Sequence, residues 1–431
     1  MCMPNKRLLI VGTTSDYIDH IRTHYPGRAL FVTDPAERAA ATEKDPAPAD
    51  ELLCDLQNTR RVHDELSTHL SRWRMGICGV VSFDCESLAL AADLAKQLAL
   101  PFPDPAAVAV SRNKFVSKQI WQKAAVPCPR TGVVRNLSDA IKFMEQGAKP
   151  VIIKPLTGSG SELLFKCDNR RDCSLAIDLI GRKLAAHPNI RMYRPEKCGT
   201  VKMDPQREFV IETFIEGQEY SCDFMLNGDQ VEIIRLAQKI LARDQSAGTT
   251  RAYVLPSRLP EPLQIDAFRL QLRDAARAMD LNRALCMVDF IVDESVAYLL
   301  EMTPRPGGDC LPQTIFQSCG LDMLGLALDF AEGKPIALPP ASSWVKMVGL
   351  RLMAKNNGII KNIGDRALRR DPRVKELYLK RRPGQRVTLP PDDYESRLLG
   401  HVIFRPAKPQ SIETECAELE SKLSVEIEAE Q

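Results

Sequence analysis

Several features that define other protein classes are missing from this sequence of 431 residues. The 58 lysines and arginines nearly balance the 56 aspartates and glutamates, so the formal net charge of +2 creates no long-range field for nucleic acid. No apolar run approaches the roughly 18 to 20 residues of a membrane-spanning helix, and the first residues show no leader cleavage pattern. We therefore expect a cytoplasmic protein that has neither a nucleic acid nor a membrane as its partner.

The sequence also gives little support for disulfide bonds, a zinc site or a catalytic histidine. The 13 cysteines are odd in number, lie among apolar neighbours and include no CxxC pair, so we expect reduced thiols in the core. The closest pairs, Cys78/Cys85 and Cys167/Cys173, lack histidines at zinc-ligand spacing. The six histidines lie outside the motifs described below, which argues against a histidine-dependent nucleophilic triad.

The N-terminal part alternates compact apolar runs with helical patterns, which predicts an α/β fold. The runs 6–12, 28–34 and 76–84 each end in glycine or aspartate and are typical of buried parallel strands. Gly12 does not open a GxGxxG fingerprint, so dinucleotide binding is weakly supported. We interpret the proline-rich segment 100–108 as a linker to a second domain.

The central and C-terminal parts show longer strand patterns. We expect a single helix from Ser111 to Val126 and another over 264–280. The expected strands are 149–164 with a loop inside, three segments within 207–237, and the pair 285–293 and 296–302. A second proline-rich junction at 333–343 precedes a small β-rich region, finished by a helix from about Ile412.

Lys154 ends the strand pattern "VIIK" and is followed by the small residues "PLTGSGS". A lysine fixed by a rigid strand beside glycines suits a polyphosphate, because the ammonium supplies charge and backbone N–H groups can approach oxygen closely. The pattern is not GxxxxGK[ST], so it is not a P-loop. Taken alone, it is more typical of an exposed lysine beside a flexible turn.

Further along, "IETFIEGQEYS" places Glu212 and Glu219 seven residues apart around an apolar connector. Such a connector can offer main-chain groups to a base while a carboxylate accepts hydrogen bonds from ribose hydroxyls. A solvated turn is the alternative interpretation of the same residues.

Asp289 in "CMVDFIVD" and Glu301 in "YLLEMTPR" form a third element. If their strands are antiparallel neighbours joined by the short "DES" connection, the two acids face each other. Like charges on a half-buried sheet repel, and Mg²⁺ relieves that repulsion with oxygen ligands. Solvated acids on an exposed face are the alternative.

Taken in order, these motifs resemble the ATP-grasp superfamily, and within it carboxylate–amine ligases similar to L-amino-acid ligases and the biotin-carboxylase-like branch. The resemblance covers essentially the whole chain. It rests on Lys114 in "SRNKFVSKQIW", on the motifs above, and on Arg305 in "LEMTPRPGG". It implies an α/β fold with a Rossmann-like domain at 1–105, a two-lobed ATP-grasp domain at 106–335 with a lid at about 130–212, and a C-terminal domain at 336–431.

The resemblance also implies roles for individual residues. Lys114 and Lys154 would contact phosphates, Glu219 the ribose, and Asp289 and Glu301 Mg²⁺ or Mn²⁺. The residues that would close over ATP are Thr157, Gly158, Ser159, Gly160 and Ser161, and those that would hold adenine are Glu212, Thr213, Phe214 and Ile215. Arg305 would face the substrate carboxylate or its acyl phosphate, and Gly307 and Gly308 would donate N–H groups to the oxyanion.

One position departs from the family pattern, which commonly has asparagine two residues after the second metal-binding acid. This chain has Thr303, and a hydroxyl is a poorer ligand for a hard cation than an amide oxygen. Thr303 is therefore kept as a candidate ligand of a less completely coordinated metal.

The function that the resemblance implies is ATP-dependent joining of a small carboxylate to an amine, with release of ADP and phosphate. A carboxylase or formyl-phosphate ligase acting on a nucleotide precursor or biotin is one alternative, and a nucleotide-binding protein without turnover is another. No "AMKM" biotin site and no QxEH-like stretch after Arg305 occur in the sequence. The expected partners are small molecules, and family members are often homodimers.

Overall fold

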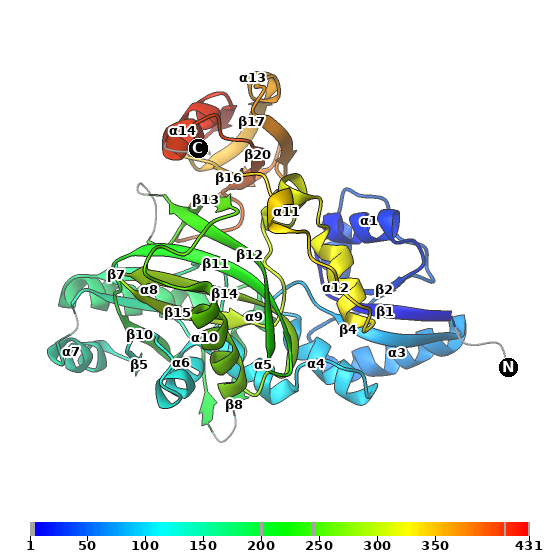
Figure 1. Ribbon diagram of the computed structural model, residues 1–431, viewed down its shortest axis with the longest axis horizontal. Coiled ribbons are helices and arrows are strands. Elements are labelled where there is room, and N and C mark those ends of the chain that lie inside the picture. Colours follow the sequence, from blue (N-terminus) through cyan, green and yellow to red (C-terminus); the bar gives the residue numbers. More distant parts are fainter. Residues whose placement is uncertain (1–4, 148, 199–200, 243–246, 409–410, 430–431) are drawn as a thin grey trace.

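The computed structural model describes residues 5–147, 149–198, 201–242, 247–408 and 411–429. Figure 1 shows an N-terminal α/β domain on one side, a smaller sheet with helices on the other, and a large curved sheet between and above them. The prediction of an α/β fold is confirmed. Within the described residues, no helix has both the length and the apolar character needed to cross a membrane.

The N-terminal domain is built on a parallel sheet in the order β3-β2-β1-β4. Its strands are β1 (Asn5–Val11), β2 (Ala29–Thr33), β3 (Glu51–Leu53) and β4 (Met75–Val81). The helices are α1 (Ser15–His24), α2 (Pro35–Ala40), α3 (Thr59–Trp73) and α4 (Leu88–Gln97). The aliphatic runs predict β1, β2 and β4 correctly because both faces of this sheet are buried.

The proline-rich segment 100–108 is not a free linker, so that prediction was wrong. Asp104 accepts a hydrogen bond from the Ala106 N–H and begins α5 (Pro105–Arg112), in which proline occupies the first turn, where its missing N–H has no cost. Asn113 then ends α5 and caps α6 (Lys114–Lys123) through the N–H groups of Phe115 and Val116. The single helix expected from Ser111 is therefore divided at Asn113.

A four-stranded antiparallel sheet in the order β5-β10-β6-β7 forms the core of the region predicted to be a lid, called the lid below; it lies at the lower left in Figure 1. Its strands are β5 (Thr131–Val134), β6 (Val151–Pro155), β7 (Phe165–Cys167) and β10 (Phe209–Thr213). The helices α7 (Leu137–Glu145), α8 (Arg170–Ala185) and α9 (Ile190–Tyr193) enclose its core. The hairpin of β8 (Glu196–Cys198) and β9 (Val201–Met203) follows.

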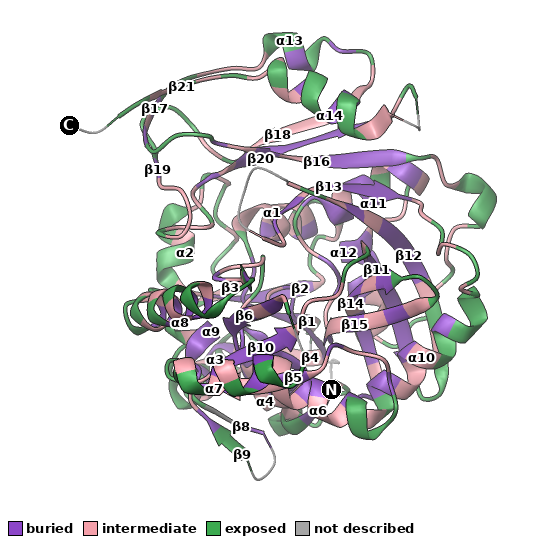
Figure 2. Ribbon diagram, turned by 90° about the vertical axis from the view of Figure 1, so that its left-hand side faces the viewer, coloured by how far each residue is buried: buried purple, intermediate pink, exposed green. Residues whose placement is uncertain are grey.

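The central element is an eight-stranded sheet in the order β15-β14-β11-β12-β13-β16-β20-β18. Its strands are β11 (Gln218–Asn227), β12 (Gln230–Leu241), β13 (Thr250–Leu255), β14 (Arg283–Asp293), β15 (Val296–Thr303), β16 (Met347–Met353), β18 (Val374–Leu379) and β20 (Leu398–Phe404). Figure 2 shows that most of these strands are buried. The β13–β16 pairing carries the sheet across position 335, so the C-terminal strands and the central strands form one sheet.

The two faces of this sheet differ in chemistry because side chains alternate along a strand. On one face, residues such as Tyr220, Phe224 and Phe290 pack with α10 (Ile265–Ala278) in an apolar core. On the other face, charged residues follow the strands, among them Asp223 and Asp289. The site described below is on this charged face.

The remaining elements connect and complete these domains. Helices α11 (Leu311–Cys319) and α12 (Met323–Ala331) follow β15, and α12 packs against the N-terminal domain. After the short η1 (Ala341–Ser343), the C-terminal part adds α13 (Arg366–Arg369), α14 (Ile412–Ser421) and the sheet β19-β17-β21, formed by β17 (Gly358–Gly364), β19 (Arg386–Val387) and β21 (Ser424–Glu428). The expectation that a helix finishes the chain was wrong, because β21 follows α14 and pairs with β17.

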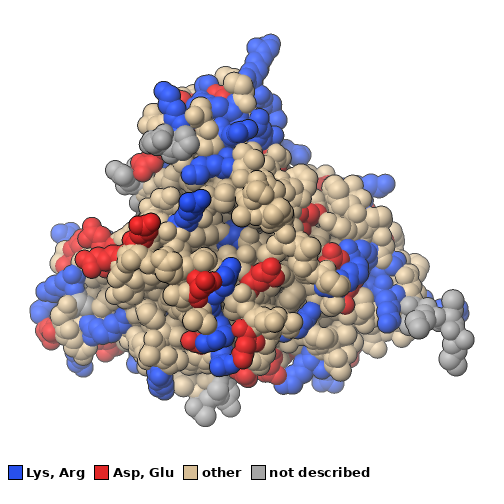
Figure 3. All heavy atoms as spheres, in the orientation of Figure 1, with Lys and Arg blue, Asp and Glu red and all other residues tan. Residues whose placement is uncertain are grey.

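Charge is mixed over the face seen in Figure 3, where lysine and arginine side chains gather mainly over the C-terminal part at the top.

Candidate active site

Lys114 connects three segments that are far apart in the sequence. Lys114 Nζ, at the start of α6, donates to the Gly158 carbonyl oxygen at 2.6 Å and lies 3.2 Å from Glu301 Oε2 on β15. Burial alone would raise the pKa of Glu301, but Lys114, Lys154 and Lys239 hold it at about 2. The glycine loop, a lysine and a candidate metal-binding acid therefore converge at one point.

A second cluster centres on the buried Glu212 carboxylate. Lys118 Nζ lies 2.8 Å from one of its oxygens and Lys154 Nζ lies 2.8 Å from the other. Burial alone would raise the pKa of Glu212, but these two ammonium groups hold it below its usual range. Burial lowers the pKa of Lys118 to about 8, because the attraction of Glu212 offsets burial only in part.

Sequence reasoning missed Lys118. Its side chain is fully buried and its ammonium also donates to the Leu300 carbonyl oxygen on β15. The signal was available, because Lys114 and Lys118 are four residues apart on α6 and so share one helix face. Lys118 thus ties α6, the lid strand β10 and the large sheet together.

The segment predicted to hold adenine begins inside β10. Glu212 and Thr213 pair with Ile152 and Val151 of β6, and the Phe214 N–H donates to the Pro150 carbonyl oxygen at 3.1 Å. Ile215 and the connector to β11 follow. The Lys166 ammonium lies 4.2 Å from the centre of the Phe214 ring. The role of these residues in binding adenine stays a prediction.

Asp289 and Glu301 are register partners on β14 and β15, as expected, because a bulge between Asp289 and Phe290 shifts the pairing by one residue. On β11, Ser221 is the partner of Asp289, and Glu219 is two residues away on the same face. Lys239 of β12 bridges these acids: its Nζ lies 2.7 Å from Glu219 Oε1 and 2.6 Å from Asp289 Oδ2. Burial raises the pKa of Glu219, and Asp289 adds to that effect while Lys239 opposes it.

The acids fit a divalent cation. Asp289 Oδ1 is shielded from solvent and accepts no hydrogen bond from any described residue, so it keeps free lone pairs beside Glu301. No group of three or more acid, histidine or cysteine side chains in the described part forms a protein-only metal cage. Mg²⁺ is usually held by one or two carboxylates together with phosphates and water, so two acids are sufficient. Thr303 is buried opposite Met287, two strand positions beyond this pair.

The glycine loop is held by contacts on both sides. Thr157 Oγ1 donates to the Met192 carbonyl oxygen at 2.8 Å, and Ser161 Oγ donates to the Gly248 carbonyl oxygen at 2.7 Å. Between them lie Gly158, Ser159 and Gly160. Gly158 adopts φ of +114°, and a Cβ there would lie 3.0 Å from the Tyr193 hydroxyl, so this position requires glycine.

The loop after β15 is positioned by a buried ion pair. Arg235 on β12 makes two hydrogen bonds of 3.0 Å to Asp223 on β11, and Asp223 Oδ1 also accepts the Gly307 N–H at 3.0 Å. A Cβ on Gly307 would lie 2.6 Å from Arg235 Nη2, whereas the nearest atom to a Cβ on Gly308 is 3.8 Å away. The Gly307 N–H is thus occupied by Asp223, while Gly308 lies in a more open part of the loop.

Arg305 points toward the N-terminal domain. Its Nε donates to Cys85 Sγ at 3.1 Å and its Nη1 to the Pro306 carbonyl oxygen at 2.7 Å. Although burial opposes the charge, Cys85 and Asp84 raise the pKa of the guanidinium, so it stays charged. Asp309, four residues after Arg305, pairs with Arg351 of β16 at 2.8 Å.

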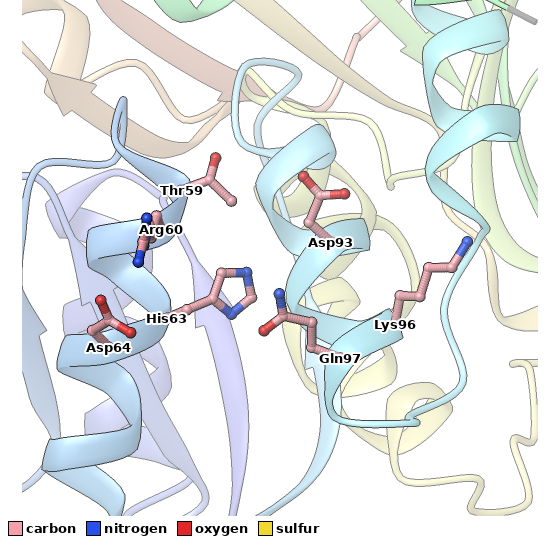
Figure 4. A pocket seen from close by; sticks show the side chains of 7 residues that line it. All are labelled: Thr59, Arg60, His63, Asp64, Asp93, Lys96 and Gln97. Atoms are coloured by element: carbon pink, nitrogen blue, oxygen red, sulfur yellow. The ribbon is translucent and has the colours of Figure 1, made fainter.

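A surface hollow of about 610 Å³ lies elsewhere, between α3 and α4 (Figure 4). Its lining mixes Arg60 and Lys96 with Asp64 and Asp93 and includes none of the candidate site residues. The candidate site on the charged face of the large sheet and this hollow are therefore separate places.

Residues 147–313 match the family model described as an ATP-grasp domain. The chain contains an ATP-grasp domain. The matched region includes the glycine loop, Lys154, Glu212 and both candidate metal-binding acids, whereas Lys114 and Lys118 precede it. The ATP-grasp domain thus accounts for most of the charged cluster.

Known proteins resemble the chain over different lengths. It is 23% identical to the uncharacterized protein y4rH of Sinorhizobium fredii, over 95% of this chain and 80% of that protein. It is 25% identical to a D-alanine–D-alanine ligase of Paracidovorax citrulli, over 49% of this chain and 59% of the ligase. The chain therefore spans about three fifths of that ligase.

Two solved structures share the fold around the ATP-grasp domain. The L-amino acid ligase from Bacillus licheniformis superposes with a TM-score of 0.74 at 18% identity, covering 99% of both chains. The N5-carboxyaminoimidazole synthetase of Staphylococcus aureus, complexed with ADP, gives 0.68 at 14% identity over 96% of both chains. At such identities the likeness establishes the fold.

Proposed function

We propose that this protein is an ATP-dependent ligase that activates a small carboxylate as an acyl phosphate and joins it to an amine. The observation that carries the proposal is the double contact of Lys114 with the Gly158 carbonyl oxygen and the Glu301 carboxylate. It brings a phosphate-binding type of loop, a cation and a metal-binding type of acid together, as phosphoryl transfer requires.

In this proposal ATP lies between the lid sheet and the charged face of the large sheet. Lys114, Lys118 and Lys154 supply positive charge to the phosphates. The connector after β10 holds adenine, and Glu219 accepts hydrogen bonds from the ribose. The residues of the glycine loop close over the phosphates from the lid side.

Asp289 and Glu301 would hold Mg²⁺ or Mn²⁺, with Thr303 as a further candidate. A bound divalent cation offsets phosphate charge and orients the γ-phosphate for in-line attack. Lys239 keeps Glu219 and Asp289 next to each other, which positions these carboxylates before the nucleotide binds.

The chemistry proceeds in two balanced steps. A carboxylate oxygen of the substrate attacks the γ-phosphorus, and the bond to the bridging oxygen breaks, so that ADP leaves with the electron pair. The amine then attacks the acyl carbon, the bond from carbon to the phosphate oxygen breaks, and the nitrogen loses a proton. Arg305 holds the carboxylate and then the acyl phosphate. Because Asp223 already accepts the Gly307 N–H, only Gly308 of the two predicted glycines is proposed to face the oxyanion.

The likeness over nearly the full length to an L-amino acid ligase supports this reaction class, as does the partial likeness to D-alanine–D-alanine ligases. Both names describe enzymes that act on amino acids, so amino acids are the first substrates to test.

The test is release of inorganic phosphate from ATP and Mg²⁺ in a matrix of amino acids, supplied singly and in pairs. We expect release that requires both an acid and an amine, together with formation of a dipeptide or amide. Release that depends on bicarbonate or formate would favour the carboxylase or formyl-phosphate alternative. ATP binding without turnover for any pair would contradict the ligase.

A further inference from the structure

Two residues of opposite charge lie near each other close to the candidate active site without forming an ion pair: Arg305 Nε donates to the sulfur of Cys85, which follows Asp84 in the chain. Asp84, after β4 of the N-terminal domain, and Arg305, after β15, are close enough for each to influence the pKa of the other. Among the described residues, neither side chain has an ion-pair partner of its own. Opposite charges in a poorly solvated place are costly to leave unpaired unless a ligand completes them.

The Asp84 carboxylate keeps one oxygen free. Its Oδ2 accepts a hydrogen bond from Ser87 Oγ at 3.2 Å, whereas Oδ1 is shielded from solvent and has no hydrogen-bond partner among the described residues. Burial raises the pKa of Asp84 to about 7, and Glu86 adds to this while Arg191 and Arg305 oppose it. A shielded acceptor without a hydrogen bond is energetically costly, so a ligand that donates a hydrogen bond to it would be stabilised. An ammonium group is a strong donor to a carboxylate.

The position of Asp84 in the fold points to a ligand independently. The parallel sheet runs in the order β3-β2-β1-β4, so the chain changes direction across the sheet between β1 and β4. Ligands of open α/β sheets bind outside the carboxyl ends of the strands at such a switch point. Asp84 follows the carboxyl end of β4 and Gly12 follows that of β1, and a Cβ on Gly12 would lie 3.2 Å from Asp84 Oδ2.

The lid also contacts the surroundings of Asp84. Arg191 on α9 donates to Ser87 Oγ at 3.0 Å, so a lid residue contacts the residue that anchors Asp84. Asp84 therefore lies where the N-terminal domain, the lid and the loop after β15 meet.

We propose that Asp84 binds the ammonium group of an α-amino-acid substrate whose carboxylate lies at Arg305. The substrate is thus a zwitterion, with one charge matched from the N-terminal domain and the other from the ATP-grasp domain. The inference rests on the proposed function for the activation of that carboxylate, and it names the substrate class as amino acids with a free α-amino group. Carboxylic acids without the amino group leave Asp84 unpaired and bind more weakly.

The experiment compares the wild-type protein with Asp84→Asn, using L-alanine against propionate, L-leucine against 4-methylpentanoate and L-glutamate against glutarate. Phosphate release gives kcat and KM for each acid at saturating amine. In the wild type, we expect each amino acid to be preferred over its analogue without the amino group. In Asp84→Asn, KM for the amino acid should rise about 10- to 100-fold, while kcat/KM for the analogue and KM for ATP stay unchanged.

The matched control is Asp64→Asn, an exposed aspartate of α3 on the hollow in Figure 4, which should leave every parameter unchanged. Equal losses for amino acid and analogue in Asp84→Asn overturn the proposal, because they would indicate a general structural effect. A fall in kcat with unchanged KM also overturns it, because it would indicate proton transfer instead of binding.

A binding measurement separates this inference from the proposed function. Calorimetry on the wild-type protein with ADP and Mg²⁺ compares L-alanine with propionate and N-acetyl-L-alanine, and likewise for the other two pairs, and needs no turnover or variant. Binding that requires the free amino group supports Asp84 recognition even if no amide forms. Equal binding of all three forms overturns it even if the ligase reaction is found.

Discussion

The Glu212 carboxylate and the Lys118 ammonium form an ion pair of 2.8 Å in which the exposed fractions of the two side chains are 2% and 0%. Lys154 lies 2.8 Å from the second carboxylate oxygen, so Glu212 pairs with two ammonium groups, one on α6 and one on β6. Removing that acid leaves two buried positive charges uncompensated, which is the costly case for buried pairs.

Glu212→Gln should therefore destabilise the protein by about 3–5 kcal/mol and lower its melting temperature. The matched control is Glu216→Gln, because Glu216 is exposed on the same connector. Thermal and urea unfolding measure both variants. Similar curves for the two variants would refute a structural role for this ion pair.

Asp289→Asn should lower phosphate release on the order of 100-fold and raise the Mg²⁺ concentration needed for activity. The reason is that Asp289 Oδ1 is a free acceptor beside Glu301, whereas Asp293, on the same strand, is exposed and serves as the control. Chelation with EDTA should abolish release by the wild type. Full activity of Asp289→Asn, with an unchanged Mg²⁺ requirement, would show that the metal assignment is wrong.

Gly307→Ala should reduce both stability and activity far more than Gly308→Ala does. The new methyl group at 307 would lie 2.6 Å from Arg235 Nη2 and 3.1 Å from Asp223 Oδ1, so the buried ion pair must shift, whereas the methyl group at 308 meets ordinary contacts. We expect a loss of about 1–3 kcal/mol and a large fall in activity for the first variant only. Unfolding and phosphate release test this, and equal effects would argue against the steric account.

The affinity for an amino-acid substrate should rise with pH through about 7, the pKa of Asp84. Below this pH the Asp84 carboxyl is protonated and neutral, so it attracts an ammonium group weakly; above it the carboxylate is charged. The kcat/KM profile for an amino acid should show this rise, and Asp84→Asn should flatten it. A rise that persists in the variant would assign the titration to another group.

The contact between α1 and α12 should make stability depend on pH. Asp322 accepts hydrogen bonds from His20 and from the Tyr25 hydroxyl, which lower its pKa to about 2 although burial opposes this. The hydrogen bond to Asp322 raises the pKa of His20.

The signs of these two shifts define a pH window. The contribution of Asp322 is complete above about pH 4, its unfolded pKa, and is lost as pH falls toward 2. The contribution of His20 is complete below about pH 6.5 and is lost as pH rises through its raised pKa. The melting-temperature difference between wild type and His20→Gln should therefore be largest at about pH 4 to 6.5. A constant difference from pH 3 to 9 would refute the linkage.

The sequence predicted those parts of the fold that depend on local patterns. Apolar runs located β1, β4, β14 and β15, because buried strands need continuous or alternating apolar residues. The short turn between β14 and β15 predicted their antiparallel pairing, but the turn alone would place Asp289 opposite Leu300. A bulge between Asp289 and Phe290 shifts the register by one residue and brings Glu301 opposite Asp289.

The rest required tertiary information. The spacing of Lys114 and Lys118 shows that they share a helix face, but not that β10 and β15 cover Lys118. Asp84 and Arg305 come near each other only because the loop after β4, the lid and the loop after β15 meet. Asn113 interrupts an otherwise continuous helical pattern through a side-chain cap whose effect competes with propensity. The joining of β13 to β16 across a proline-rich junction is likewise set by strand pairing over nearly one hundred residues.

The pairing of β13 with β16 limits where the chain can be truncated. A chain cut near residue 335 would strip β16 from β13 and leave the main-chain N–H and C=O groups of Ala252 to Leu255 facing water along a bare, apolar border. An exposed edge strand of this kind readily pairs with strands of other chains, so we expect the shortened protein to aggregate. The ATP-grasp part and the C-terminal part should therefore be expressed and purified as one chain.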